Sequence, residues 1–533
     1  MVTPVLRTPV LVVGAGVTGC LLALELARHE VPSVVLERAA RPPRQPDLTL
    51  VDGRSVELLR RLGLADRVRA VAVDPGCPVE VLWSRRLDQA PVHVWRLSSP
   101  DELRRAYAAT ADEDALVEPY LLVGGADLTG ALLAAARDHP LVDLRTGWTC
   151  TDLRQEPSGT VATALEAATG TRHLIEARYL AGCDGAHSTV RRCLGVPVDE
   201  SEPAGHHLTV SFRHPLRRPG SCPEHPGPTM IVAGGITLSR RRPGDAWVAQ
   251  VPLDHDDTAA TDPARLLRDR LGIDLDGPDV LGVTQWDDGL GVASHFRRGT
   301  TFLAGQAAHR FHPPSGRIDT CVGDAVDLGW KLAAAVAGWA GPALLASYED
   351  ERRQRALVDR ELLVRALETR RRFGRLAAAG ASADFLAGFL RQEPPQLDPA
   401  GAVGSGAYPR SAVLWQERTV ARPGRRGVRL GVRPPAVRLA GEPLLDRLGP
   451  QFTLVDLTDT ATGRPLVAAA HGRGVPMTHL SVADLAVRAS WASRLVLVRP
   501  DQHVAWHADR SPSDWEAVLD VVTGRRPQEH VNA

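Results

Sequence analysis

The segment Val10-Leu11-Val12-Val13-Gly14-Ala15-Gly16-Val17-Thr18-Gly19 decides the fold of the N-terminal part of the chain. Its first four residues form a continuous aliphatic run, which is typical of a strand buried on both faces. The three glycines that follow permit a tight turn, a close approach of the backbone to a ligand, and close packing of helix on strand. A helix-like run from Cys20 to about Arg28 comes next. This order predicts a parallel α/β sheet whose first strand ends at a ligand-binding turn.

A carboxylate after the second strand makes the glycine turn a more specific sign of a nucleotide site. A second apolar run, Ser33 to Leu36, leads into Glu37, which stands 23 residues after Gly14. A carboxylate at the tip of the second strand can accept hydrogen bonds from both ribose hydroxyls of an adenosine. The sequence therefore predicts an adenine dinucleotide site, with Gly14, Gly16 and Gly19 at the pyrophosphate and Glu37 at the ribose.

Two later segments contain similar turns between a strand and a helix. In the first, the run from Tyr179 leads into Asp184-Gly185, and Ser188-Thr189 then caps a basic helix. In the second, the apolar run Thr301 to Ala304 ends at Gly305, and a Pro-rich loop leads into another helix. Such turns are where α/β folds present backbone N–H groups to an electron-rich ligand.

We expect an α/β protein with three domains. The first is a Rossmann-like domain over residues 1–195 and 295–390, interrupted at 196–294 by a mostly antiparallel sheet that would bind substrate. The expected strands of the inserted sheet are His207 to Phe212, Thr229 to Leu238 and Ala246 to Val251.

The C-terminal part begins after a stretch rich in proline and glycine, which we predict to be a linker over residues 391–424. Residues 425–533 contain three strand-like runs and a final helix, so we predict a small α/β domain. Ser513 and Glu516 predict a capping box for that helix, and Gly524 predicts its end.

Composition excludes several classes of protein. The 533-residue chain has a net charge of zero and 44% hydrophobic residues, which gives no support for a nucleic-acid partner. We expect a cytoplasmic protein with no membrane partner, because no signal peptide or 18-residue apolar run is visible. Seven cysteines without a CxxC pair predict reduced, mostly buried thiols. His206, His207, His214 and His225 lack a complete set of metal ligands, so we predict solvated loop histidines and no metal site.

The glycine turn, Asp184-Gly185, and the Gly305 segment leading into Trp330-Lys331-Leu332 together resemble group A flavoprotein monooxygenases. These are the aromatic hydroxylases related to p-hydroxybenzoate and phenol hydroxylase, and the likeness is strongest to members acting on phenols and aromatic polyketides. It covers nearly the whole chain, including a tail that resembles a thioredoxin fold. It implies FAD as the cofactor, NAD(P)H as the reductant, O₂ as the oxidant, a small-molecule substrate and a possible homodimer.

The resemblance also implies roles for single residues. Arg54 would support the FAD and substrate cavity, and Asp184 would lie near the pyrophosphate and the nicotinamide route. Asp324 would lie near the start of a helix whose dipole favours negative charge at flavin N1–C2=O. For both aspartates, simple helix capping is the alternative. Further residues would contact the cofactor, namely Gly305, Gln306 and Gly316, with Pro313 and Pro314 lining the reactive face of the flavin.

The segment after Gly305 departs from the family pattern. Gln306 stands where the family has Asp, which replaces a charge-assisted hydrogen bond by a neutral one at a loss of roughly 1 kcal/mol. The family's Gly-Gly-x-Gly-x-Asn run reads Ser315-Gly316-Arg317-Ile318-Asp319-Thr320 here, and Ile318 has a β-branched side chain where glycine would allow close approach. Four outcomes stay open: normal FAD binding with local rearrangement, weak or altered binding, a structural FAD, or no flavin. The intact adenosine end argues against the last.

We therefore expect an FAD-dependent monooxygenase that hydroxylates or epoxidises an aromatic or polyketide intermediate of secondary metabolism. The alternative is a non-redox cyclase or isomerase on the same scaffold, with FAD structural or weakly bound. A binding or regulatory protein is a third reading. No acid/base pair, nucleophile or metal centre stands out in the sequence, as expected if the chemistry belongs to the cofactor.

Overall fold

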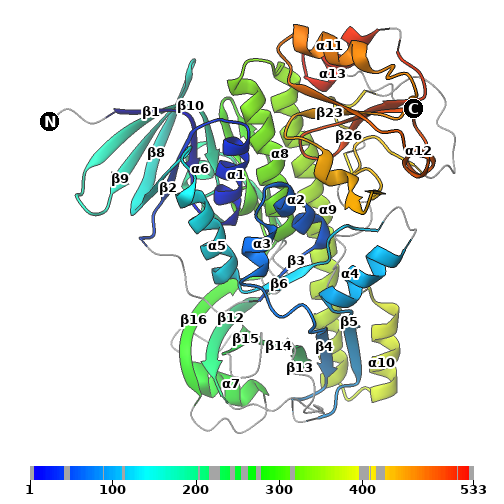
Figure 1. Ribbon diagram of the computed structural model, residues 1–533. Helices are drawn as coiled ribbons and strands as arrows, with labels where there is room; N and C mark the ends of the chain where they lie inside the picture. The colour runs from blue at the N-terminus through cyan, green and yellow to red at the C-terminus, as the bar shows by residue number, and fades with distance from the viewer. Residues whose placement is uncertain are drawn as a thin grey trace.

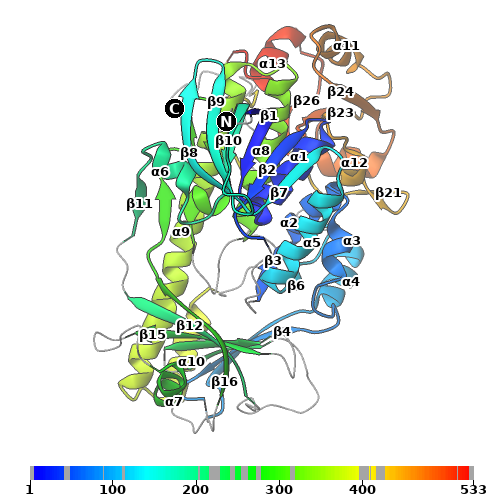
Figure 2. The ribbon, with the colours of Figure 1, turned by 90° about the vertical axis from the view of Figure 1, so that its left-hand side faces the viewer.

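The computed structural model describes residues 5–40, 48–87, 89–110, 115–201, 205–214, 229–233, 235–240, 246–253, 262–271, 278–311, 318–394, 407–408, 410–415, 427–512 and 514–526. Figures 1 and 2 show a first domain around β1 and β10, a second sheet below it, and a C-terminal domain beside it. The long helix α9 (Pro342–Ala378) runs from the first domain down to the second sheet.

The first domain is built on an eight-stranded sheet whose central neighbours run parallel. In sheet order its strands are β18 (Arg297–Arg298), β19 (Thr301–Leu303), β10 (Arg172–Gly182), β1 (Val5–Val13), β2 (Ser33–Glu37) and β7 (Val142–Thr146), with β9 (Gly159–Glu166) and β8 (Trp148–Glu156) joined antiparallel to β10. The aliphatic run Val10 to Val13 is at most 5% exposed, which confirms the predicted buried strand.

Helices and short strands complete the first domain. Helix α1 (Val17–Arg28) begins directly after the glycine turn and packs against α8 (Ile318–Val336) and α5 (Gly125–Asp138). Its other elements are α2 (Gly53–Arg61), α3 (Ala65–Arg69), α4 (Pro100–Ala109), α6 (Thr189–Cys193), β3 (Thr49–Val51), β6 (Leu121–Val123) and the 3₁₀ turn η1 (Gly305–Ala307), with the small sheet β11 (Val198–Glu200), β17 (Gly291–Ala293) and β20 (His309–Arg310).

The second sheet has seven strands and includes residues outside the predicted range 196–294. In order they are β16 (Asp279–Asp287), β12 (His206–Arg213), β15 (Trp247–Leu253), β14 (Ile236–Arg240), β13 (Thr229–Ala233), β4 (Val79–Ser84) and β5 (His93–Leu97). The last two come from the first 195 residues, and β4 pairs with β13 in parallel. The prediction of one strand over Thr229 to Leu238 is wrong, because a turn at Gly235 (φ +83°) folds it into the β13–β14 hairpin.

The two faces of the second sheet have different neighbours. One face carries Leu208, Val210 and Phe212 and packs on α7 (Pro263–Leu271). At the β4 end of the other face, Trp83 and Val232 pack on α9 and on α10 (Ala383–Gln392). Figure 2 shows α7 below the sheet and the first domain above it, so this second face is directed toward the first domain.

The C-terminal domain has a four-stranded sheet in the order β24 (Met477–Ser481), β23 (Phe452–Asp456), β25 (Leu495–Val498), β26 (Val504–Ala508). Helices α11 (Arg464–Gly472), α12 (Leu485–Trp491) and α13 (Trp515–Val522) accompany it, with the short elements β21 (Arg438–Leu439), β22 (Glu442–Pro443) and η2 (Leu444–Arg447). The strands predicted over Phe452 to Leu457 and Arg494 to Val498 are confirmed.

Two predictions for this part need correction. Part of the predicted linker is packed: Tyr408, Val413 and Leu414 are buried in the core of the C-terminal domain. The final helix is capped by Asp514, whose carboxylate accepts from the N–H of Ala517 at 3.0 Å, and the predicted cap Ser513 lies outside the described residues. The predicted end at Gly524 is confirmed by its φ of +71° directly after the helix.

Among the helices in the described ranges, none is both long enough and apolar enough to cross a membrane. The six described cysteines are free, and four of them are buried, as the sequence predicts.

Candidate cofactor and substrate site

The structure brings the glycine turn, Asp184 and Gly305 together at the carboxyl ends of three neighbouring strands. The N–H of Cys183 donates to the carbonyl of Val13 at 2.7 Å, and the N–H of Ala304 donates to the carbonyl of Gly182 at 3.0 Å. These bonds join the ends of β1, β10 and β19. Segments separated by more than a hundred residues in the sequence therefore form one edge, where parallel sheets bind ligands.

The glycines of the turn are required by local geometry. Gly14 has a φ of +101°, and a Cβ there would lie 2.4 Å from the carbonyl oxygen of Cys183. A Cβ on Gly19 would lie 1.9 Å from the carbonyl oxygen of Gly14, so helix and strand meet without room for a side chain. A Cβ on Gly16 would meet nothing within 4 Å, so the backbone is open on that side. This open cradle at the N-terminus of α1 fits a pyrophosphate.

Glu37 lies at the end of β2 beside this cradle. Its two carboxylate oxygens accept from the N–H groups of Ala15 at 2.9 Å and Ala39 at 2.8 Å. The side chain is therefore oriented by the glycine turn itself, and each oxygen keeps a lone pair for a further donor. Two oriented carboxylate oxygens fit the paired hydroxyls of a ribose.

Asp184 follows β10, next to Gly14. Its Oδ2 accepts from the N–H groups of Thr189 at 2.7 Å and Val190 at 3.1 Å, which caps the first turn of α6. Its Oδ1 is buried and has no partner within the part of the chain that the structure describes. Capping therefore explains one oxygen of Asp184, while the other still needs a donor, as a bound ligand would supply.

Gly305 packs directly against the glycine-turn segment. It has a φ of +61°, and a Cβ there would lie 2.2 Å from Oγ1 of Thr18. The next residue, Gln306, is exposed in the 3₁₀ turn η1, so its amide is free to turn toward a ligand at this edge.

Asp324 holds the turn at Gly305 in place through a buried hydrogen bond. Its Oδ2 accepts from the N–H of Gly305 at 2.8 Å and is 2.9 Å from Nε2 of His309, and its Oδ1 accepts from Nε of Arg352 at 2.7 Å. Burial would raise the pKa of Asp324, but Arg352 and His309 outweigh it and hold the pKa below its usual value. Asp324 lies in the second turn of α8, as the resemblance implies, but it is not a helix cap.

Sequence reasoning missed three residues that hold this edge together. Arg352 and His309 bind Asp324, and Arg191 donates to the carbonyl oxygens of Ala307 at 2.8 Å and Ala186 at 2.7 Å. Arg352 and His309 carry no local pattern, because Asp324 lies on another element, and Arg191 joins the nearby Ala186 to the distant Ala307. The basic character of the helix after Ser188 was the single signal, and it did not distinguish Arg191 from Arg192.

The loop that departs from the family pattern, residues 312–317, lies outside the described residues. It contains Pro313, Pro314 and Gly316, and α8 begins immediately after it, at Ile318. Ile318 is half-buried, and the carboxylate of Asp319 accepts from the N–H of Asp52 at 2.9 Å. The start of α8 is thus bonded to the start of α2.

The described contacts of Arg54 lie between α2 and the C-terminal domain. It lies at the start of α2, and its guanidinium donates to Glu57 at 3.1 Å, to Oε1 of Gln502 at 3.2 Å and to the carbonyl of Asp501 at 3.1 Å. Two of these partners belong to the C-terminal domain. Arg54 therefore connects α2 with that domain.

The second sheet presents polar and aromatic side chains toward the first domain at its β12 end. The rings of His207 and Trp286 stack with centroids 4.5 Å apart and planes at 14°, and the indole N–H of Trp286 donates to Thr209 at 2.8 Å. Nε2 of His207 is 2.9 Å from Asp288, which also binds Arg371 of α9. Burial would raise the pKa of Asp288, but hydrogen bonds from His207 and Arg371 hold it well below its usual value.

For His206 and His207, the structure corrects the prediction of solvated loop histidines. His206 and His207 lie in β12, and His207 is ordered by stacking and an ion pair. His225 lies outside the described residues. The pattern of alternating residues in a strand was the available signal, since it places His207 on the same face as Thr209 and Ser211.

Two family models match the chain. The model described as FAD binding domain matches residues 7–360, and the model described as aromatic-ring hydroxylase, C-terminal, matches residues 427–526. A curated relative, the FAD-dependent monooxygenase apdD of Emericella nidulans, is 30% identical, with 95% of this chain and 88% of the relative covered.

Solved structures agree over the full length. The rebeccamycin biosynthetic enzyme RebC with reduced flavin is 28% identical with a TM-score of 0.82, covering 98% of this chain and 99% of that one. A ternary complex of aklavinone-11 hydroxylase with FAD and aklavinone is 26% identical with a TM-score of 0.77, covering 97% and 99%. The open glycine cradle, the oriented Glu37 and the unpartnered oxygen of Asp184 fit the cofactor of these proteins. The chain therefore belongs to the FAD-binding aromatic-ring hydroxylases and is an FAD-dependent monooxygenase.

Proposed function

We propose that this monooxygenase hydroxylates or epoxidises an aromatic or polyketide intermediate of secondary metabolism, with NAD(P)H as the reductant. One observation carries the proposal. The edge that fits a dinucleotide and the polar, aromatic face of the second sheet belong to one chain and face each other, bridged by α9. Relatives of this architecture include proteins named as a polyketide hydroxylase and a tetracenomycin monooxygenase-dioxygenase.

In this proposal the first domain holds FAD, which supplies the oxygen-transfer chemistry when bound. Gly14, Gly16 and Gly19 leave room for the pyrophosphate, and Glu37 accepts from the adenosine ribose. The N–H groups at the start of α1 attract the negative charge of the pyrophosphate. Asp184 contributes its unpartnered oxygen on the same side.

The flavin end of the site uses Gly305 and Gln306. Asp324 fixes the backbone of Gly305 through a buried hydrogen bond, and His309 and Arg352 fix Asp324 in turn. The amide of exposed Gln306 replaces the charged acceptor of the family for a ribityl hydroxyl. Beyond it, Gly316, Pro313 and Pro314 are proposed to line the flavin from the loop before α8, whose N-terminal dipole favours negative charge.

The substrate lies, in this proposal, on the face of the second sheet that carries His207. A stacked imidazole and indole offer a flat surface to a planar aromatic ring. Thr209, Ser211 and Gln250 alternate toward the same face and offer hydrogen bonds to phenol or carbonyl oxygens. The ion pair with Asp288 fixes the ring of His207, so this surface is preorganised.

Several finer points are part of the same proposal. Residues 1–195 and 295–390 bind FAD, except that β4 and β5 join the sheet of residues 196–294, which binds substrate. The protein acts in the cytoplasm, with a homodimer as its assembly. The C-terminal domain is thioredoxin-like, which the sheet order β24-β23-β25-β26 with one parallel pair supports. Without a cysteine in residues 425–533 it performs no thiol chemistry.

Purification of the full chain, followed by substrate trials, tests the proposal. We expect a yellow protein whose NAD(P)H oxidation is stimulated by a phenolic or polyketide substrate and consumes O₂, with one oxygen atom from ¹⁸O₂ in the product. Substrate conversion under anaerobic conditions without NAD(P)H would instead establish the cyclase or isomerase alternative. A colourless protein that takes up no FAD would contradict the cofactor assignment.

A further inference from the structure

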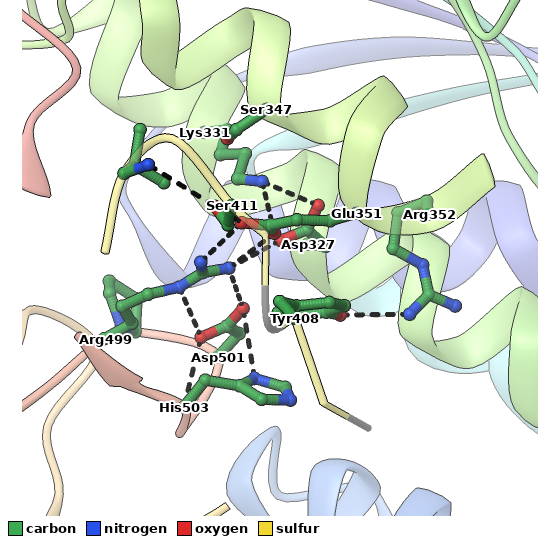
Figure 3. A network of polar contacts seen from close by, with 12 residues as sticks. Asp327, Lys331, Ser347, Glu351, Arg352, Tyr408, Ser411, Arg499, Asp501 and His503 are labelled. Atoms are coloured by element: carbon green, nitrogen blue, oxygen red, sulfur yellow. Dashed lines mark hydrogen bonds and ion pairs between the residues drawn. The ribbon is translucent and has the colours of Figure 1, made fainter. Parts of the chain in front are cut away.

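A group of buried charges joins α8, α9 and the C-terminal domain (Figure 3). Lys331, the single lysine of the chain, donates to Asp327 at 2.9 Å and to Glu351 at 2.7 Å. Arg499, in the turn after β25, donates to Glu351 at 2.7 Å, to Asp327 at 2.9 Å and to Asp501 at 2.5 Å. The side chains of all five are at most 2% exposed.

This group contains more carboxylates than cations. The carboxylate oxygens of Asp327, Glu351 and Asp501 lie within 4.8 Å of one another, a spacing that could hold a metal ion. Arg499 already donates to all three, and Lys331 to two of them. Lys331 and Arg499 supply two positive charges for these three carboxylates, and Arg54 and Arg61 add positive charge near Asp501. Burial raises the pKa of Asp327, and Glu351 and Asp501 add to this against the effect of Lys331 and Arg499.

A cavity of about 50 Å³, lined by both charged and apolar side chains, adjoins the buried charges. Asp327, Asp501 and His503 line it on one side, and Arg54 of α2 and Asp319 of α8 line it on another. Because a buried water needs roughly 15 Å³, the cavity has room for about three waters. It therefore extends from the charged group to the first turns of α2 and α8, next to the proposed flavin site.

His503 has an unpartnered atom at this cavity. The residue is 6% exposed, its Nδ1 is 3.3 Å from Oδ2 of Asp501, and its ring lies against that of Tyr408 with centroids 4.6 Å apart. Nδ1 and Nε2 are both buried, and neither has a hydrogen-bond partner in the described ranges. Burial lowers the pKa of His503, partly offset by Asp501. Nδ1 faces the carboxylate of Asp501, so a neutral ring that carries its proton on Nδ1 would leave a lone pair on Nε2.

We propose that the cavity holds ordered water and that His503, oriented by Asp501, exchanges protons with this water through Nε2 for the reaction at the N-terminal end of α8. The proposal rests on the proposed function. Hydroxylation with NAD(P)H takes up one proton per turnover, because substrate, O₂, NAD(P)H and H⁺ give hydroxylated substrate, NAD(P)⁺ and water.

The proton step changes only N–H and O–H bonds. A proton carried by cavity water adds to the lone pair of Nε2, and the same atom later returns it to water on the α8 side. Burial disfavours the imidazolium and lowers the pKa of His503; Arg54 and Arg499 act in the same direction, and Asp501 partly offsets them. His503 acts through water and does not touch the substrate, which makes it a positioning residue.

The first test compares the pH profiles of His503→Gln and a matched control in the FAD-loaded full chain. The control, His507→Gln, changes a histidine of β26 whose Nδ1 is 2.9 Å from Oγ of Ser493, away from the cavity. We expect the His503 variant to lose about tenfold in kcat at pH 8 and little at pH 6, where bulk protons are abundant. An unchanged profile with unchanged thermal stability would overturn the proposal.

Chemical rescue separates proton transfer from packing. In His503→Ala, added imidazole and its methylated derivatives should restore turnover in an order that tracks their pKa values. A recovery that depends only on the size of the added base would show a space-filling role and contradict the proposal.

A further arm needs no activity, so its failure is distinct from failure of the proposed function. In the FAD-free full chain labelled with ¹⁵N-histidine, the signal missing in His503→Gln should show an unprotonated Nε2 at pH 7. A high-resolution crystal structure should show water within hydrogen-bond distance of Nε2. A protonated Nε2, or an inorganic anion or cation in place of water, would overturn the proposal even in an active enzyme.

Discussion

The first domain meets its two neighbours in opposite ways. Toward the C-terminal domain, Arg61 of α2 is buried, binds Glu25 of α1 at 2.5 Å and donates to the carbonyl of Pro500 at 2.7 Å. Trp330 and Phe452 join the two domains in one hydrophobic cluster. Toward the second sheet, by contrast, His207 and Thr209 remain partly exposed on a polar face.

The difference shows how the chain separates stability from binding. A junction of fully buried ion pairs tolerates little relative movement, because opening it would leave charges in an apolar interior. A polar, partly exposed face can exchange water for a ligand at low cost. We therefore expect substitutions at the first junction to change unfolding, and substitutions at the second to change substrate binding.

The largest expected effect comes from removing a central cation of the rigid junction. Arg499→Met leaves three buried carboxylates with Lys331 alone, so we expect a loss of about 3–5 kcal/mol in the free energy of unfolding. Urea unfolding followed by tryptophan fluorescence measures it. The exposed pair of Arg154 with Glu156 offers a control, since Arg154→Met should change stability by less than about 0.5 kcal/mol. Equal losses of stability in the two variants would contradict the claim that the buried ion pairs stabilise the fold more than exposed pairs do.

Acid should weaken the same junction through Glu25. Arg61 and His29 overcome the effect of burial and lower the pKa of Glu25 from 4.5 to about 2. A lowered carboxyl pKa stabilises the fold above pH 4.5, and that contribution is lost as the pH falls toward 2. The stability advantage of the wild type over Glu25→Gln should shrink by about 3 kcal/mol between pH 6 and pH 2. A pH-independent difference would contradict this.

A smaller effect is expected at the polar face. His207→Leu removes the ring that stacks on Trp286 and leaves Asp288 paired with Arg371. We expect KM for the substrate to rise about tenfold, equivalent to about 1.4 kcal/mol, with little change in kcat. Steady-state kinetics and a melting curve of the same sample measure both readouts. A large drop in melting temperature with unchanged KM would show that His207 stabilises the fold and does not bind substrate.

The smallest effect is a gain. Gln306→Asp restores a charged acceptor at an exposed position, so we expect FAD to bind about fivefold more tightly, or roughly 1 kcal/mol, without altered stability. Fluorescence titration of the FAD-free protein measures the dissociation constant. Gln306→Ala is the control and should bind no more tightly than the wild type. Tightening in both variants would show that the amide obstructs the site.

Sequence reasoning correctly predicted the local structure on which the proposed site depends. The strand, turn and helix around Gly14 are one continuous segment, and their glycines are explained by contacts within that segment and to Cys183. The position of Glu37 at the end of β2 is also a local property. Such features depend on periodicity and backbone sterics, which the sequence shows directly.

Features that depend on distant pairing were missed. The addition of β4 and β5 to the second sheet joins residues about 150 positions apart. Alternation of polar and apolar residues predicts a strand but does not show which strand it pairs with. The same holds for Asp324 with Arg352 and for Arg499 with Glu351. The packed segment around Tyr408 looked like a linker because glycine and proline surround it. Buried charge networks follow from the assembled fold, so composition alone could not reveal them.

The solitary, fully buried Lys331 makes this enzyme unusual as a target for covalent chemistry. Amine-directed dyes, crosslinkers and resins find no exposed lysine on the folded chain. Modification of Lys331 by such a reagent would then report, with no background from other lysines, each occasion on which the C-terminal domain lifts away from α8. The rate of that labelling measures how often this interface opens. Mass spectrometry of the peptide that contains Lys331 detects it.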